Sequence, residues 1–276
     1  MTEEQIRFTD GAAYERYMGV WSRFVGEAFL EWLAPEHGLR WLDVGCGSGA
    51  FTEMLVHRCA PASVDGIDPS EEQLAFARTR PALRLARLHR GDAMALPFPI
   101  HNFDAAIMPL VIFFVPDPAK GISEMARVVA PGGLVTAYAW DMPGGGFPYR
   151  ALFEVLRNQG VVVPSAPGPD ASSMDAMRAL WTGAGLEALE TRVITVQRTF
   201  ASFDDYWTTI LGSASVARIL AAMTPEQMAP IRARMKEILP AAADGRITYS
   251  ATANAIAGRV LGAQGRRKRT ALLSPS

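Results

Sequence analysis

A glycine-rich turn between a short apolar segment and a helical one constrains this chain more than any other feature. Residues 40–44 are predicted to form a strand, and a Gly-Cys-Gly-Ser-Gly run follows at residues 45–49. Glycine lets the backbone turn sharply and approach a ligand with no Cβ in the way. Because a helix is expected directly afterwards, its N-terminal amides face the same space. The pattern predicts a ligand site at the carboxyl end of the first strand.

Strand-like and helix-like segments alternate along the chain, which indicates parallel β-α-β units with right-handed crossovers. The predicted strands are residues 40–44, 64–67, 85–90, 103–110, 134–140, 186–200 and 247–260. The predicted helices are residues 13–33, 51–58, 71–80, 119–129, 174–184 and most of 202–239. The expected fold class is therefore α/β, a Rossmann-like, doubly wound and mostly parallel sheet. Its last strand is expected to be antiparallel, with a helical cap inserted before it.

Composition is that of an ordinary globular protein. The 276 residues are 49% hydrophobic and 20% charged, so the chain can bury a core without disulfides. A net charge of −1 gives no reason to expect nucleic acid as a partner. Two cysteines and four scattered histidines suggest neither a disulfide framework nor a metal site. The polar N-terminus is unlike a signal peptide, and no apolar run approaches the roughly 18 residues of a membrane span. A cytoplasmic location is expected.

Three aspartates lie at or just after the ends of the first three predicted strands, and each suits a different part of one ligand. Asp43 lies two residues before the first glycine, where a carboxylate can pair with a ligand ammonium group. Asp68 ends the second strand and can accept hydrogen bonds from two ribose hydroxyls. Asp92 follows the third strand and can accept from an adenine amino group. Together they describe an adenosine that carries a zwitterionic amino-acid tail.

At this point the sequence resembles the class I S-adenosylmethionine-dependent methyltransferases. It is most similar to the branch that includes small-molecule enzymes and ubiquinone/menaquinone methyltransferases. The resemblance is carried in order by residues 41–52, 66–78, 91–98 and 103–136, with a Val-Pro-Asp-Pro segment at 115–118. It implies S-adenosylmethionine as the cofactor. The candidate cofactor-binding residues are Tyr17, Trp21, Asp43, Gly45, Cys46, Gly47, Asp68, Pro69, Ser70, Gln73, Asp92, Ala93, Met94 and Met108.

Other functions fit parts of the same pattern. Gly45, Gly47 and Ala50 also satisfy the dinucleotide fingerprint, so an NAD-dependent oxidoreductase is an alternative. Asp43 argues against it, because a negative charge there disfavours a pyrophosphate. A non-catalytic cofactor-binding protein of the same fold is the second alternative. A nucleic-acid methyltransferase is disfavoured, because the fourth strand lacks an Asn-Pro-Pro-Tyr-type segment and the chain has no Pro-Cys pair.

The expected activity is in-line methyl transfer to a small, hydrophobic acceptor. No catalytic residue is assigned, because a general base is needed only if the attacking group of the acceptor is protonated. Asp141 is the candidate for such a base. The apolar stretch 108–114 predicts a wall near the sulfonium, and Tyr206 or Trp207 is predicted to line the acceptor pocket. The chain is predicted to be one methyltransferase domain, 1–276. Its predicted parts are an N-terminal helical segment 1–38, a cofactor-binding core 39–141, a loop insertion 142–173, a helical cap 202–243 and a disordered tail 262–276. The acceptor, the atom that is methylated and the oligomeric state stay open.

Overall fold

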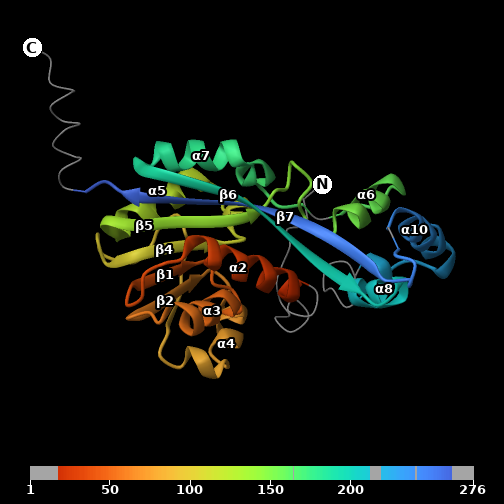
Figure 1. Ribbon diagram of the computed structural model, residues 1–276, viewed down its shortest axis with the longest axis horizontal. Coiled ribbons are helices and arrows are strands. Elements are labelled where there is room, and N and C mark those ends of the chain that lie inside the picture. Colours follow the sequence, from red (N-terminus) through yellow and green to blue (C-terminus); the bar gives the residue numbers. More distant parts are fainter. Residues whose placement is uncertain (1–17, 164, 212–218, 240, 263–276) are drawn as a thin grey trace, which may run out of the picture.

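The core of the protein is a seven-stranded sheet (Figure 1). The computed structural model describes residues 18–163, 165–211, 219–239 and 241–262. The strands are β1 (Arg40–Val44), β2 (Ser63–Asp68), β3 (Arg87–Arg90), β4 (Phe103–Pro109), β5 (Val129–Trp140), β6 (Leu186–Phe200) and β7 (Ile247–Val260). Their order is β3-β2-β1-β4-β5-β7-β6, and β7 runs antiparallel to both of its neighbours. The predicted fold class and its antiparallel last strand are confirmed.

Helices cover both faces of the sheet. They are α2 (Val20–Leu33), α3 (Ala50–Cys59), α4 (Glu71–Ala77), α5 (Pro118–Val128), α6 (Arg150–Asn158), α7 (Met174–Gly183), α8 (Phe203–Leu211) and α10 (Pro225–Ile238). α2 packs on α3 in front of the strands, and α5 packs on α7 on the other side (Figure 1). Several helices begin at a side chain that accepts a backbone N–H: Ser70, Asp117, Ser173 and Thr224.

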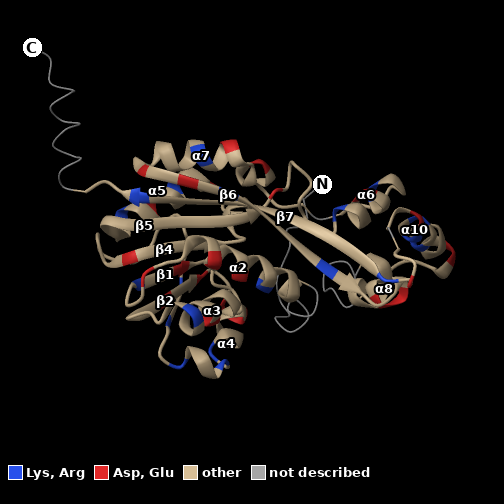
Figure 2. Ribbon diagram, in the orientation of Figure 1, with Lys and Arg blue, Asp and Glu red and all other residues tan. Residues whose placement is uncertain are grey.

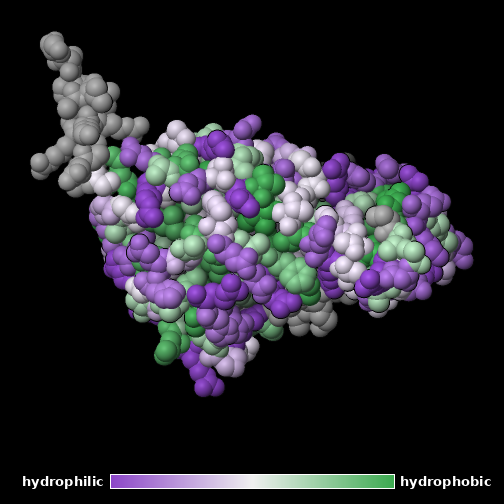
Figure 3. Space-filling view, in the orientation of Figure 1, coloured by the Kyte–Doolittle hydropathy of each residue, from purple (hydrophilic) through white to green (hydrophobic). Residues whose placement is uncertain are grey.

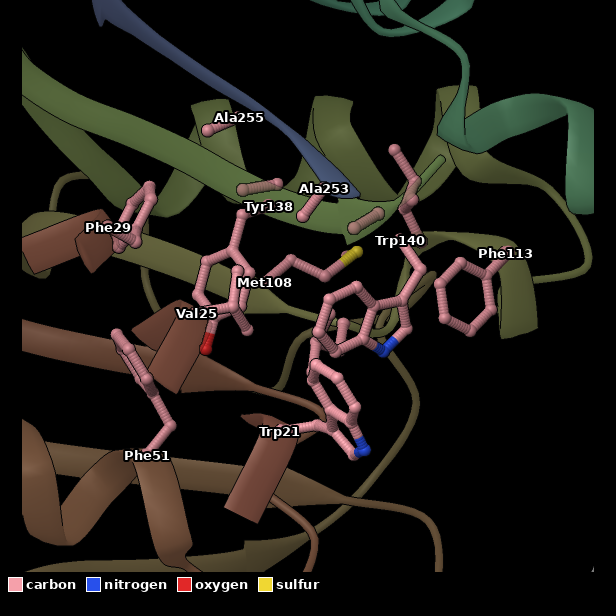
Figure 4. Close-up of a cluster of buried hydrophobic side chains, with 14 of the residues drawn as sticks. Trp21, Val25, Phe29, Phe51, Met108, Phe113, Tyr138, Trp140, Ala253 and Ala255 are labelled. Atoms are coloured by element: carbon pink, nitrogen blue, oxygen red, sulfur yellow. The ribbon is translucent and has the colours of Figure 1, made fainter. Parts of the chain in front are cut away.

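Large aromatic side chains fill the space between α2 and the sheet (Figure 4). Trp21, Phe29, Tyr138 and Trp140 are all at most 1% exposed. Phe29 and Tyr138 approach with ring centroids 4.7 Å apart, and Phe51 of α3 lies 5.5 Å from Tyr138. This packing fixes α2 and α3 against the carboxyl half of β5, which is the side on which the predicted ligand site lies.

Residues 142–173 were predicted as a loop, and that prediction is wrong in one respect. The segment contains α6 and the short 3-10 helix η4 (Pro169–Ser172). α6 buries Leu152, Val155 and Leu156, which lie at helical spacing. The glycines and prolines on either side concealed a helix that tertiary packing stabilises. Tyr17 and residues 263–276 of the predicted tail lie outside the described residues.

The two strands nearest the sheet edge extend well past the others. β6 has 15 residues and β7 has 14, and α6, α8 and α10 gather at their far end (Figure 1). We call this group the distal lobe. Along the described chain, none of the helices combines the length and the apolar character needed to cross a membrane. Acidic and basic residues are interspersed over the ribbon (Figure 2), and hydrophobic residues are scattered among hydrophilic ones on the face in Figure 3.

Candidate functional site

The turn after β1 has the backbone conformation that its glycines predict. Gly45, Gly47 and Gly49 all have positive φ, at 76°, 51° and 79°. A Cβ on Gly45 would lie 2.5 Å from a methyl carbon of Val111, so no larger residue fits there without displacement. The amides of Gly45 and Cys46 both donate to the Ile67 carbonyl, at 2.8 and 3.1 Å. These bonds tie the turn to the end of β2.

Asp43 is completely buried directly beneath this turn. The Thr52 hydroxyl donates to its Oδ2 at 2.6 Å, while Oδ1 has no hydrogen-bond partner among the described residues. Burial raises the pKa of Asp43 to about 7, although the Thr52 bond lowers it, and the nearby Asp68 charge raises it further. An unpartnered buried carboxylate oxygen is costly, so Asp43 is prepared to accept a cationic or hydrogen-bonding ligand group.

Asp68, at the end of β2, is joined to the turn by its own carboxylate. The amide of Gly47 donates to Oδ2 at 2.9 Å, and that of Ser70 donates to Oδ1 at 2.8 Å. Burial raises the pKa of Asp68, and the two amide bonds oppose that rise. Each carboxylate oxygen can accept more than one hydrogen bond, so both still have capacity for a pair of hydroxyl groups. The side chain of Ser70 accepts the Gln73 amide and starts α4 beside it.

Asp92 follows β3 and is exposed. Its Oδ1 accepts the Met94 amide at 2.8 Å, which closes a small turn after Gly91. Gly91 packs tightly, because a Cβ there would lie 2.7 Å from Ile67. The turn therefore presents Asp92 and Ala93 to the same side of the sheet as Asp68.

One cavity of about 1230 Å³ connects these strand ends. The predicted residues that line it are Gly45, Cys46, Gly47, Asp68, Pro69, Ser70, Gln73, Asp92 and Ala93. Asp43, Met94 and Met108 do not line it; Met108 is fully buried in the core. The wall predicted after β4 is present, since Leu110, Val111 and Phe114 line the cavity.

The structure does not bring Trp21 to this cavity. Its side chain is 0% exposed and its indole Nε1 donates to the Tyr149 hydroxyl at 3.2 Å. Helical spacing turns Trp21 into the core, while its neighbours Val20, Ser22 and Arg23 on α2 line the cavity. The prediction that Trp21 contacts the cofactor is therefore corrected: it is a core residue.

The described part of the predicted cap does not line the cavity either. No described residue of the range 202–243 lines it. Tyr206 and Trp207 are 2% and 6% exposed and pack with Phe200 and Phe203 in the distal lobe. Asp141, the candidate base, accepts the Gly144 amide at 3.0 Å and does not line the cavity. Sequence reasoning missed Ser22 of α2, Phe51 and Met54 of α3 and Tyr138 of β5, which do line it.

The residues that line the cavity fit S-adenosylmethionine. The glycine turn leaves room for a ligand at Gly47, where only Gln73 Oε1 lies within 4 Å of an added Cβ, at 4.0 Å. Asp68 has capacity for two hydroxyls and Asp92 stands at the next strand end; Asp43, two residues before the turn, has an unpartnered buried oxygen but does not line the cavity. The described residues contain no cluster of His, Cys, Asp or Glu suited to a metal ion.

Comparison with known proteins agrees with this geometry. Residues 42–137 match the methyltransferase domain family. A rice 2-methyl-6-phytyl-1,4-hydroquinone methyltransferase (Oryza sativa subsp. japonica) is 42% identical over 96 residues, 35% of this chain and 28% of that protein. A demethylmenaquinone methyltransferase of Staphylococcus aureus is 37% identical over 145 residues, 52% of this chain and 58% of that protein. The chain thus spans less than two thirds of the length of either relative.

Solved structures show the same fold at low identity. The YcgJ protein of Bacillus subtilis aligns with a TM-score of 0.59 at 17% identity, over 86% of this chain and 97% of that one. Phosphoethanolamine N-methyltransferase 2 of Haemonchus contortus aligns with a TM-score of 0.56 at 19% identity, over 90% and 56%. The fold is the Rossmann-like fold of these structures. Within it, residues 42–137 match the methyltransferase domain family, and about half of the chain or less is similar in sequence to quinone methyltransferases.

Proposed function

We propose that this protein transfers a methyl group from S-adenosylmethionine to a small, largely hydrophobic acceptor. One observation carries the proposal: a single cavity joins the carboxylates of Asp68 and Asp92 to the apolar wall after β4. When bound, S-adenosylmethionine supplies an activated methyl group on a sulfonium for in-line displacement.

Each acidic residue would hold a different part of the cofactor. Asp43 does not line the cavity, but with its Oδ1 buried and unpartnered just before the glycine turn, its carboxylate would attract the ammonium group of the amino-acid tail. Asp68 would accept both ribose hydroxyls while its amide bonds from Gly47 and Ser70 hold the carboxylate in place. Asp92 and Ala93 would contact the adenine ring.

The apolar residues would position the acceptor and exclude water. Leu110, Val111 and Phe114 lie on one side of the cavity, with Phe51 and Tyr138 contributed by α3 and β5. Alignment of two reactants in such a site can contribute roughly 7–11 kcal/mol to catalysis. Residues 108–114 carry no histidine, although His57 of α3 also lines the cavity; an acceptor that is already nucleophilic would need no base from the wall.

The names of the relatives support this acceptor class. The rice protein is named for a phytyl hydroquinone and the S. aureus protein for demethylmenaquinone. We therefore propose an aromatic, quinol-like acceptor. The lining of the cavity is mostly apolar, which suits such a molecule.

A different reaction on the same fold is the second candidate. The [4+2]-cyclase SpnF aligns with a TM-score of 0.52 at 20% identity, over 95% of this chain and 88% of that one. A cavity of this architecture therefore does not by itself imply methyl transfer. An NAD-dependent oxidoreductase is not favoured, because the buried Asp43 would disfavour a pyrophosphate.

Binding and turnover test the proposal separately. Calorimetry should show micromolar binding of S-adenosylmethionine and S-adenosylhomocysteine, about −8 kcal/mol at 1 μM, with NADH as the negative control. Incubation with S-adenosylmethionine and a short-chain naphthoquinol should then yield a singly methylated product by mass spectrometry. No heat with either cofactor form would refute the proposal, and binding without methylation of any quinol or phenol would favour the second candidate.

A cytoplasmic location is proposed as well. Cys46 and Cys59 are both free and buried, which suits a reducing compartment. Fractionation of cells that produce the tagged protein tests this directly.

A further inference from the structure

Arg80 reaches the glycine turn from the far end of the α4 segment. It precedes the 3-10 helix η2 (Pro81–Leu83), its side chain is only 15% exposed, and it lines the cavity. Its Nε donates to the Ser48 carbonyl at 2.6 Å, and its Nη1 donates to Glu53 Oε2 on α3 at 2.6 Å. One side chain thus joins the turn, the helix that follows it and the segment after β2.

The first part of the turn that Arg80 contacts is held by the amides of Gly45 and Cys46, which donate to Ile67, and Arg80 holds its later part at Ser48. Three of its five residues are glycines, which lose the most conformational freedom when they are ordered. Gly49 is packed against the same segment, because a Cβ there would lie 2.5 Å from Leu83 and 3.1 Å from Ala77. Residues 77–83 therefore brace the turn by close packing and by the Arg80 hydrogen bond.

The chemistry of arginine suits this position. A guanidinium is a planar fork that can donate to two acceptors at once, whereas a lysine ammonium is a single point. Burial lowers the pKa of Arg80, but arginine keeps its charge in proteins. The Glu53 carboxylate offsets the cost of burying that charge, and the Phe76 ring lies 5.5 Å from the guanidinium carbon.

We infer that Arg80 is a positioning residue that holds the glycine turn in its ligand-binding conformation, by donating to the Ser48 carbonyl and to Glu53 together. The inference rests on the proposed function, because the turn matters through the cofactor that it would hold. Arg80 itself acts through the turn, and no contact with the reacting atoms is required.

The first test compares Arg80→Met with Arg78→Met. Arg78 lies two residues earlier, is about half exposed and pairs with Glu71, so it controls for loss of an arginine in this segment. We expect Arg80→Met to weaken S-adenosylhomocysteine binding roughly 10- to 100-fold, the loss of a charged hydrogen bond. Arg78→Met should bind like the parent. Equal affinity of Arg80→Met and the parent, measured below the melting temperature of both, would overturn the inference.

Two further measurements separate positioning from general stability. Glu53→Gln removes the ion pair but keeps an amide oxygen that can accept from Arg80, and it leaves the Ser48 bond, so it should lower the melting temperature and weaken binding much less than Arg80→Met does. Amide hydrogen exchange in a peptide that spans residues 45–55 should rise in ligand-free Arg80→Met and not in Arg78→Met. The inference is contradicted if Glu53→Gln weakens binding as much as Arg80→Met does, or if hydrogen exchange in the turn of Arg80→Met is unchanged. Either result would mean that the hydrogen bond from Arg80 to Ser48 does not hold the turn in place.

If Arg80→Met does not fold, the affinity for S-adenosylhomocysteine can be measured in Arg80→Lys instead. A lysine can reach one acceptor but not both, so weakened binding at a near-parent melting temperature is expected. Full affinity in the lysine variant would contradict the two-acceptor role. Failure of the parent protein itself to bind S-adenosylhomocysteine would refute the proposed function, while hydrogen exchange would still report on the brace.

Discussion

The three aspartates at neighbouring strand ends differ sharply in environment, and this difference fits three different ligand groups. Asp43 is completely buried, Asp68 is 9% exposed and bonded by two amides, and Asp92 is exposed. A buried carboxylate gains most from pairing with a cation, whereas a bonded and accessible one is suited to hydroxyl groups. We therefore expect these three side chains, although chemically identical, to interact with different groups of the cofactor.

Asp68→Ala should weaken S-adenosylhomocysteine binding by about 2–4 kcal/mol. The variant loses two charge-assisted bonds to the ligand, each worth roughly 1.5–3 kcal/mol, with partial recovery by water. It also leaves the Gly47 amide without the Asp68 carboxylate to which it donates in the parent protein. Calorimetry measures the change, with Asp104→Ala as a control, because Asp104 pairs with Arg40 and does not line the cavity. Unchanged affinity in a folded Asp68→Ala protein would mean that the ribose is held elsewhere.

Asp43 should make stability fall as pH rises from about 4 to about 7. Its pKa is about 7 in the folded protein and near 4 when unfolded, so the folded state alone keeps the proton in this window. Binding of a proton by the folded state stabilises it at low pH, and that stabilisation is lost as the pH approaches 7. Above about pH 7 the effect is constant.

Asp43→Asn isolates this effect from the other titrating groups. Its amide oxygen can still accept the Thr52 hydroxyl, but it binds no proton. Urea unfolding at about pH 5 and about pH 8 should therefore show the variant gaining stability relative to the parent as pH rises. Parallel curves for the two proteins would show that Asp43 is ionised throughout.

Sequence reasoning predicted cavity-lining aspartates at strand ends and missed lining residues that depend on the packing between elements. Asp68 and Asp92 were predictable because parallel strands end at one edge, where a motif of a few residues fixes each side chain, whereas Asp43 does not line the cavity. Ser22, Met54 and Tyr138 reach the cavity only because α2 packs on α3 and β5. The same cause explains Trp21: its aromatic character suggested a contact, and the rotation of α2 buried it.

At the scale of elements, regular periodicity was predictable and packing-dependent structure was not. The predicted strands agree with β1, β2, β4, β6 and β7 to within one residue at each end. β5 begins earlier than predicted, at Val129, because Val129 pairs with Phe103 across an irregular register. α6 was missed, since its nine residues lie between glycine-rich stretches and are stabilised by burial of one face.

Gly45→Ala should disrupt the glycine turn far more than a matched glycine elsewhere. Gly45 and Gly132 have nearly the same φ, 76° and 80°, so alanine costs each about 1–2 kcal/mol in backbone strain. Only at Gly45 would the new Cβ meet Val111, at 2.5 Å, whereas nothing lies within 4 Å at Gly132. Overpacking adds roughly 1–3 kcal/mol.

Thermal unfolding and calorimetry with S-adenosylhomocysteine measure both effects. Gly132→Ala should lose some stability and keep its affinity, and Gly45→Ala should lose more of both. Adding Val111→Ala to Gly45→Ala should restore part of the stability. If the two single variants behave alike, the Val111 contact has no role.

At the scale of the molecule, the cavity and the distal lobe are separate features of one chain. The lobe rests on β6 and β7, where Phe200 contacts Tyr206 with ring centroids 5.2 Å apart. It meets the core near Tyr149, whose hydroxyl accepts the Trp21 indole. Burial raises the pKa of Tyr206 beyond the usual tyrosine range, and the nearby Tyr149 and Tyr249 add to the rise. The lobe therefore contributes a second packed cluster that is distinct from the cavity lining.

Trp207→Ala tests whether this lobe serves stability or acceptor binding. Trp207 is 6% exposed and stacks on Phe203 with centroids 5.9 Å apart, so truncation should cost about 3–5 kcal/mol of unfolding free energy. Because neither residue lines the cavity, we expect the affinity for S-adenosylhomocysteine and the methylation rate to stay at parent values below the melting temperature. Trp207→Phe should recover much of the stability. If the methylation rate falls in Trp207→Ala while cofactor affinity is unchanged, the distal lobe takes part in binding the acceptor.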